Sequence, residues 1–193
     1  MEIETVRQQC WRKALECFGT SHIFEVRANV LRRRLRILAF LGIAVPALVG
    51  AILMAFGTDS KLVVPLLTIA SILGLIQLIG SIWSVTARWD DNFGYALEAR
   101  SANRLLFEKY RALAESPPRT DKEATTQYSL IESECNARTN EDEKQSISED
   151  EKRMGMRAAL RQLRKQCAGC GNVPSSMEPT ECDVCGKFPT WRF

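Results

Sequence analysis

Two long apolar stretches without any charged residue dominate the pattern of this chain. Residues 37–57 and 62–87 contain no Asp, Glu, Lys or Arg, whereas the remaining segments mix apolar and charged positions. At about 1.5 Å per helical residue, each stretch is long enough to cross a hydrocarbon core of about 30 Å. The pattern predicts an all-α membrane protein in which residues 37–87 form a two-helix transmembrane hairpin. Buried helices of a soluble core are the alternative, but small cores do not need uncharged runs of this length.

Basic residues flank the two apolar stretches, and the connection between the stretches offers only Lys61. Because positive residues remain on the cytoplasmic side, both termini are expected in the cytoplasm and the connection outside. The same arginines are expected to contact anionic lipid headgroups. The membrane-flanking basic residues are Arg32, Arg33, Arg34, Arg36 and Arg88.

Small and polar residues recur along one face of the second apolar stretch. They are Gly74, Gln77, Ser81 and Ser84, at steps of three or four that place them on one side of a helix. One interpretation is close helix packing, which small residues favour in membranes. The other is a water-lined path in a homo-oligomer, since polar groups within a bilayer need partners.

Amphipathic segments surround the hairpin. Residues 1–36 predict cytoplasmic helices interrupted at Gly19, and residues 88–118 predict a further cytoplasmic helix that ends before a Pro-Pro pair. Residues 119–147 form an acidic linker or helix, and residues 148–166 form a basic helix. Ser148 and Glu151 have the spacing of a capping box that opens this basic helix.

Four cysteines near the end of the sequence carry the clearest chemical signal. They form two C-x-x-C pairs, each followed by glycine and separated by eleven residues: Cys167, Cys170, Cys182 and Cys185. Four thiolates in this spacing favour a structural zinc ion, so residues 167–193 predict a small zinc ribbon; an iron centre or redox dithiols are the alternatives. Because cysteine fills all four positions, no open coordination site is left for a catalytic water.

Composition adds little to this picture. The chain is 46% hydrophobic and has a formal net charge of +3, which are values typical of a soluble protein. These averages do not show that the apolar residues are concentrated in two stretches. The sequence has no Walker-type glycine loop and no G-x-S-x-G motif, so an enzyme is not expected.

The four-cysteine spacing resembles the bacterial mobilome CxxCx(11)CxxC proteins, and the preceding segments are similar to the SLATT domain. That second resemblance is carried by short segments around the two spans: 18–20, 24–28, 32–50, 83–85 and 89–91. It implies a bacterial inner-membrane effector of a conflict or anti-phage defence system. Such an effector would receive a nucleotide signal directly or through a sensor protein, self-associate and permeabilise the membrane.

A membrane-anchored adaptor is the alternative function. In that case the hairpin only anchors the chain, and the zinc ribbon with the basic helix recruits a protein or, less consistently with the charge pattern, a nucleic acid. The recurring small and polar face favours the effector, because a simple anchor does not need it.

Overall fold

The computed structural model describes residues 2–56 and 63–189, and its regular structure is helical, with no strand in these ranges. The prediction of an all-α chain is therefore confirmed. The connection between the apolar stretches, with Lys61, lies outside the described residues, as do the ends of those stretches at Gly57 and Leu62. The helices are α1 (Ile3–Phe56), α2 (Val63–Thr86), α3 (Trp89–Glu115), α4 (Asp121–Glu143) and α5 (Glu149–Leu163).

The chain divides into two compact units. The first, here called the bundle unit, comprises Met1–Arg27 and Tyr95–Phe193, and the second, the apolar unit, comprises Ala28–Gly94. Helices α1 and α3 each contribute residues to both units.

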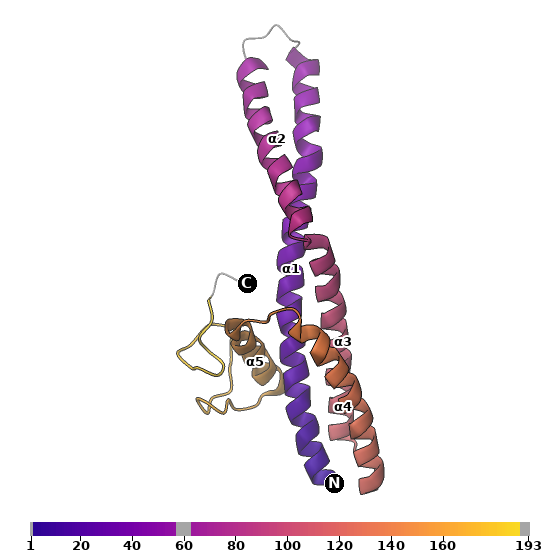
Figure 1. Cartoon of the computed structure of the whole chain (residues 1–193). Coiled ribbons are helices and arrows are strands. Elements are labelled where there is room, and N and C mark those ends of the chain that lie inside the picture. Colours follow the sequence, from indigo (N-terminus) through magenta and orange to yellow (C-terminus); the bar gives the residue numbers. More distant parts are fainter. Residues whose placement is uncertain (1, 57–62, 190–193) are drawn as a thin grey trace. The chain divides into compact units, whose positions relative to one another are not determined.

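Parts of α1, α3 and α4 lie side by side in the bundle unit and share one hydrophobic core (Figure 1). Tyr110 of α3 and Cys10 of α1 are fully buried in this core, which also takes in Tyr128 of α4. The rings of Phe18 and Phe107 meet edge to face at 5.2 Å between centroids, a preferred aromatic geometry. The acidic segment before residue 147 is therefore mostly a packed helix, with Ala124, Tyr128 and Cys135 turned into the core and Leu130 exposed.

Helix α5 packs against α1 where two glycines face each other. A Cβ on Gly19 would lie 3.1 Å from the carbonyl oxygen of Gly155, and a Cβ on Gly155 would lie 2.6 Å from that of Gly19. The expected interruption of the first helix at Gly19 is wrong, because α1 continues through this residue. Tertiary packing outweighs the weak helix propensity of glycine here, and the missing side chain lets the two backbones approach.

The start of α5 is fixed by a capping box and by an ion pair. The Ser148 hydroxyl accepts a hydrogen bond from the Glu151 N–H, and the Glu151 carboxylate accepts one from the Ser148 N–H. Arg27 of α1 donates to both oxygens of the same carboxylate, each at 2.8 Å. The predicted capping box is thus present, and it is also tied to α1.

In the apolar unit, α2 packs beside the second half of α1 (Figure 1). In the amide orientation that satisfies both partners, Gln77 donates to the carbonyl oxygen of Leu41 at 3.2 Å and accepts from the N–H of Gly42 at 3.1 Å. A Cβ on Gly80 would lie 3.2 Å from Leu38, and Ser84 is buried. The small and polar face of α2 is therefore the side that contacts α1.

Candidate metal centre

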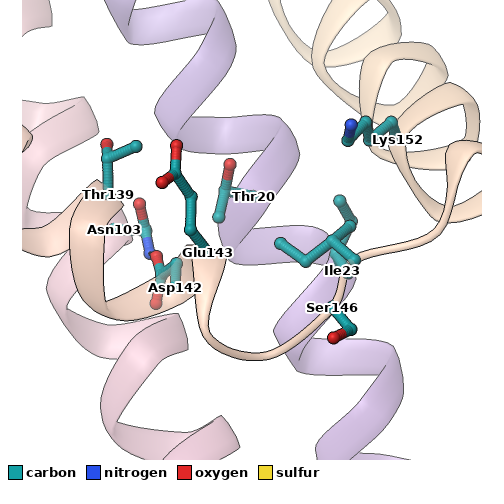
Figure 2. Close-up of a pocket in the computed structure, with 9 residues that line it drawn as sticks. Thr20, Ile23, Asn103, Thr139, Asp142, Glu143, Ser146 and Lys152 are labelled. Atoms are coloured by element: carbon teal, nitrogen blue, oxygen red, sulfur yellow. Dashed lines mark hydrogen bonds between the residues drawn. The ribbon is translucent and has the colours of Figure 1, made fainter.

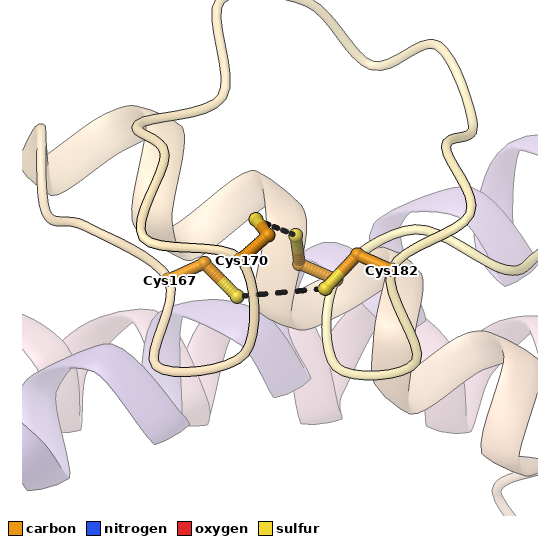
Figure 3. A group of neighbouring side chains, drawn as sticks. Cys167, Cys170 and Cys182 are labelled. Carbon is orange, nitrogen blue, oxygen red and sulfur yellow. Dashed lines mark hydrogen bonds between the residues drawn. The ribbon is translucent and has the colours of Figure 1, made fainter.

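The four predicted cysteines come together in one cluster in the bundle unit. Their sulfur atoms all lie within 4.8 Å of one another (Figure 3). The Sγ atoms of Cys167 and Cys182 are 3.9 Å apart, and those of Cys170 and Cys185 are 4.0 Å apart. A tetrahedral ion with Zn–S bonds of about 2.3 Å separates its sulfurs by roughly 3.8 Å. The donor set and its spacing thus fit a tetrahedral metal ion such as zinc.

Each C-x-x-C pair sits on a tight turn that brings its two sulfurs to the same side. The N–H of Gly171 donates to the Cys167 carbonyl at 2.8 Å, and the N–H of Gly186 donates to the Cys182 carbonyl at the same distance. Gly171 has φ of 72°, a left-handed conformation that disfavours side chains. A Cβ on Gly186 would lie 2.4 Å from the Thr180 carbonyl oxygen. The glycine after each pair is therefore required, for a different reason in each turn.

These turns form the two halves of the site without any strand among residues 167–189. The segment is thus a pair of cysteine turns whose geometry fits a metal ion, and the strands that the term ribbon implies are not found in this range. The fold of the segment depends on the backbone turns and on the thiol cluster, because few side chains are available to form a core.

The local backbone favours the anionic form of one thiol. Hydrogen bonds from the N–H groups of Cys185 and Val184 lower the pKa of the Cys182 thiol to about 7. Burial raises the pKa of the Cys185 thiol, so this side chain would remain neutral without a cation. A metal ion would offset this cost by stabilising the thiolates that it binds.

Two arginines of α5 hold the cysteine turns against the helix. Arg157, itself buried, donates to the carbonyl of Ser176 at 2.8 Å and to that of Cys185 at 3.3 Å. Arg153 donates to the carbonyl of Asp183 at 2.9 Å. The basic character of residues 148–166 thus serves in part to satisfy carbonyls of the metal-binding turns. Charge counting along the sequence cannot show this, because the acceptors are backbone atoms.

The cluster is also part of the hydrophobic core. Cys167 and Cys185 are each 1% exposed and pack with Leu160 of α5, while Leu15 of α1 covers the same group. By contrast, Cys170 is exposed. Cys182 is partly buried and packs against the same cluster, so three of the four cysteines connect the candidate metal centre to the bundle and only Cys170 is exposed.

The remaining predicted residues lie in the apolar unit. Gln77, Ser81 and Ser84 follow the α2 face described above, and Gly74 precedes them with no atom within 4 Å of its Cβ position. The Arg32 guanidinium lies over the ring of Phe93 and that of Arg34 over the ring of Trp89, and Arg88 pairs with Asp91 at 2.8 Å. Arg33 and Arg36 are exposed.

A second polar site was not predicted from the sequence. A cavity of about 410 Å³ lies between α1, α3, α4 and the segment after α4, with Asn103, Asp142 and Glu143 in its wall (Figure 2). The buried Asp142 carboxylate accepts hydrogen bonds from Tyr95, Asn103 and Arg138. Both carboxylate oxygens are engaged, so this residue has a structural role in joining α3 to α4.

Comparison with known proteins identifies a family whose sequence model covers most of the chain. The sequence model of the family described as Mobilome CxxCx(11)CxxC protein matches residues 7–188, which includes both units and all four clustered cysteines. No curated protein and no solved structure matches the chain significantly.

Proposed function

Because this chain belongs to the Mobilome CxxCx(11)CxxC protein family, we propose that it is a bacterial inner-membrane effector of a conflict or anti-phage defence system. It would self-associate on receiving a signal and permeabilise the membrane. The similarity to the SLATT domain supports the effector role and a nucleotide signal, received directly or through a sensor protein. Zinc at the four cysteines would have a structural role.

The exposure of the apolar helices carries the membrane part of this proposal. Helices α1 and α2 each contain an apolar stretch of 18 residues, and no residue of either stretch is buried. Ile43 is 75% exposed, Met54 90% and Val64 69%. Side chains of this kind are buried in a soluble core, and leaving two whole helices of them in water would be costly. A lipid bilayer provides the apolar surroundings that these helices need.

The basic residues support one orientation in that bilayer. Arg32, Arg34 and Arg88 lie beside aromatic or acidic partners at the ends of the apolar segments. Aromatic rings and arginines are typical of the membrane–water interface, and excess positive charge marks the cytoplasmic side. Both termini would therefore be cytoplasmic. Epitope tags at either end should be protected from protease in intact spheroplasts, and digestion of only one tag would contradict this topology.

In this proposal, the packing of Gln77 against α1 would correspond to a closed state. Its amide is satisfied by the backbone of α1, so within one chain the polar face of α2 is not available to line a pore. Permeabilisation would require α2 to exchange α1 for α2 of another copy, with Gln77 and Ser81 turning toward a shared axis. The energetic cost of exposing polar groups to lipid favours such exchange only within an oligomer.

Membrane potential in growing cells tests the effector role. The full chain, expressed with its genomic neighbours, should depolarise the membrane when the system is triggered. Gln77→Leu combined with Ser81→Leu should abolish depolarisation while the protein still enters the membrane fraction. Ile76→Leu is the matched control, because Ile76 is on the outer side of α2 with 60% exposure. Unchanged depolarisation in the double variant, or none in the unmodified chain, would argue against a pore.

An adaptor is the second candidate, favoured by the fact that Gln77 already has its partners within one chain. The exposed Val173 and Val184 on the metal-binding segment would then contact a protein partner. Replacing residues 37–87 by an unrelated hairpin separates the two functions. An adaptor retains its activity after this exchange, whereas an effector that acts through α2 loses it.

A further inference from the structure

Two cysteines that are far apart in the sequence and outside the metal centre contact each other in the bundle unit. The Sγ of Cys17 in α1 lies 3.9 Å from the Sγ of Cys135 in α4, across a separation of 118 residues. Both side chains are buried, at 3% and 6% exposure. The third core cysteine, Cys10, is fully buried on α1 one heptad before Cys17. No spacing or motif in the sequence indicates that Cys17 and Cys135 are paired.

The surroundings of Cys135 favour its thiolate. The contact with Cys17 lowers the pKa of the Cys135 thiol against the effect of burial, and Tyr110 and the charge of Lys13 add to this lowering. The same contact raises the pKa of the Cys17 thiol, so of the two thiols Cys135 is the one that ionises first. The Tyr110 hydroxyl is buried and has no hydrogen-bond partner among the described residues. A thiol contact of this kind holds one nucleophilic sulfur beside a second sulfur that can resolve an oxidised intermediate.

We propose that Cys17 and Cys135 are a modification site, at which hydrogen peroxide converts the two thiols into a disulfide between α1 and α4. The Cys135 thiol first loses its proton, and its thiolate attacks one peroxide oxygen. The O–O bond breaks, Cys135 becomes a sulfenic acid, and the departing hydroxide takes up the proton that the thiol released and leaves as water. The sulfur of Cys17 then attacks the resulting sulfenic acid. The S–S bond forms as the S–O bond breaks, and the second hydroxide leaves with the Cys17 proton as water.

A disulfide needs the two sulfurs, which are 3.9 Å apart here, to approach to about 2.05 Å. The bond would join α1 to α4, two helices of the same core. This inference stands on the bundle unit alone and does not depend on the proposed effector role.

Peptide mapping of the full chain in isolated membranes tests the inference. The membranes are treated with hydrogen peroxide, free thiols are alkylated under denaturing conditions, and the protein is digested with trypsin. Cys17 and Cys135 fall in the peptides 14–27 and 123–138, Cys10 in 8–12, and all four clustered cysteines in 166–187. The expected product is peptide 14–27 linked to 123–138, lighter by two hydrogens than the sum of its parts and lost after reduction.

Three variants sharpen the result. Cys10→Ser should leave the linked peptide unchanged, whereas Cys135→Ser should remove it. Tyr110→Phe keeps the ring but lacks the hydroxyl, so it should slow formation of the link. The inference is overturned if Cys17 and Cys135 are still fully alkylated after peroxide treatment of the unmodified chain, or if Cys17 is found linked to Cys10 instead. Because mapping of the unmodified chain decides the matter, a variant that fails to fold does not weaken the test.

Discussion

The carbonyl oxygen of Gly19 in α1 lies 2.6 Å from the position that a Cβ would occupy on Gly155 in α5. Gly155→Ala would place a methyl group against rigid backbone, so α5 must move away from α1. We expect a loss of about 1–3 kcal/mol in the free energy of unfolding, as for other overpacked contacts. Thermal unfolding in detergent measures this.

Gly94→Ala is the control for this substitution. Gly94 also lies within a helix, but no atom is found within 4 Å of its Cβ position. Alanine there should leave stability unchanged or raise it by up to about 1 kcal/mol, through its better helix propensity. Equal unfolding temperatures for Gly155→Ala and the unmodified chain would show that the glycine contact is not required.

Removal of the Asp142 carboxylate should be strongly destabilising. Asp142→Ala leaves the Arg138 guanidinium, 7% exposed, without its closest partner. Glu98 and Glu141 still contact the guanidinium, at 3.1 and 3.0 Å, so the cost arises from the donors on Arg138, Tyr95 and Asn103 that lose their acceptor. Each buried donor left unsatisfied costs about 1–3 kcal/mol. Glu141→Ala is the matched control, because Glu141 contacts the same guanidinium at 3.0 Å but is 57% exposed. Its loss should cost less than about 1 kcal/mol. Denaturant unfolding of the two variants should therefore differ clearly, and similar midpoints would refute this role for Asp142.

The amount of bound metal should depend on the four clustered cysteines and should not depend on Cys10 in the core of the bundle. Cys185→Ser removes a buried ligand, so purified protein should lose its equivalent of zinc when measured by mass spectrometry of the elements. Cys10→Ser should retain the metal. Chelation of the unmodified chain should increase hydrogen exchange in residues 167–188, because this segment has little core of its own. Metal retained in full by Cys185→Ser would contradict the proposed site.

The ion pair between Arg27 and Glu151 predicts an acid-dependent loss of stability. Burial acts to raise the pKa of the Glu151 carboxyl, but hydrogen bonds from Arg27 and Ser148 outweigh it and lower the pKa to about 2. Since the folded-state pKa lies below the ordinary value of 4.5, the stabilisation is present above pH 4.5 and disappears as the pH falls toward 2.

Comparison with Glu151→Gln isolates this contribution. The unmodified chain should be more stable than the variant at neutral pH, by up to about 2 kcal/mol after allowance for solvent screening. The difference should shrink across the interval between pH 4.5 and 2, while any acid effect on the metal centre is common to both proteins. A difference that does not change with pH would rule out this ion pair as the cause.

Local sequence signals predicted the features that depend on neighbouring residues. The capping box of Ser148 and Glu151 spans four residues, as does each C-x-x-C turn, so the spacing alone defines their geometry. The helical class followed from periodicity, and the end of α3 at Glu115 from the Pro-Pro pair that follows it.

The features that the sequence could not reveal depend on contacts between distant segments. From the sequence alone, Gly19 is expected to interrupt the helix, because its packing partner, Gly155, is far away along the chain. From the sequence alone, Arg157 is expected to be a solvated surface charge. In the structure it donates a hydrogen bond to the carbonyl of Cys185, which no local pattern predicts. No periodicity could relate Cys17 to Cys135, because their contact depends on how α4 returns along α1.

The burial of Cys167 and Cys185 among core side chains links metal binding to the cellular abundance of the folded protein. A metal held there would bind the folded chain and not the unfolded one, so its free concentration would add to folding stability by mass action. During zinc starvation the bundle would lose that contribution, and quality-control proteases would meet more unfolded chain. Cellular abundance of the protein would then report the zinc supply, with no dedicated sensor required.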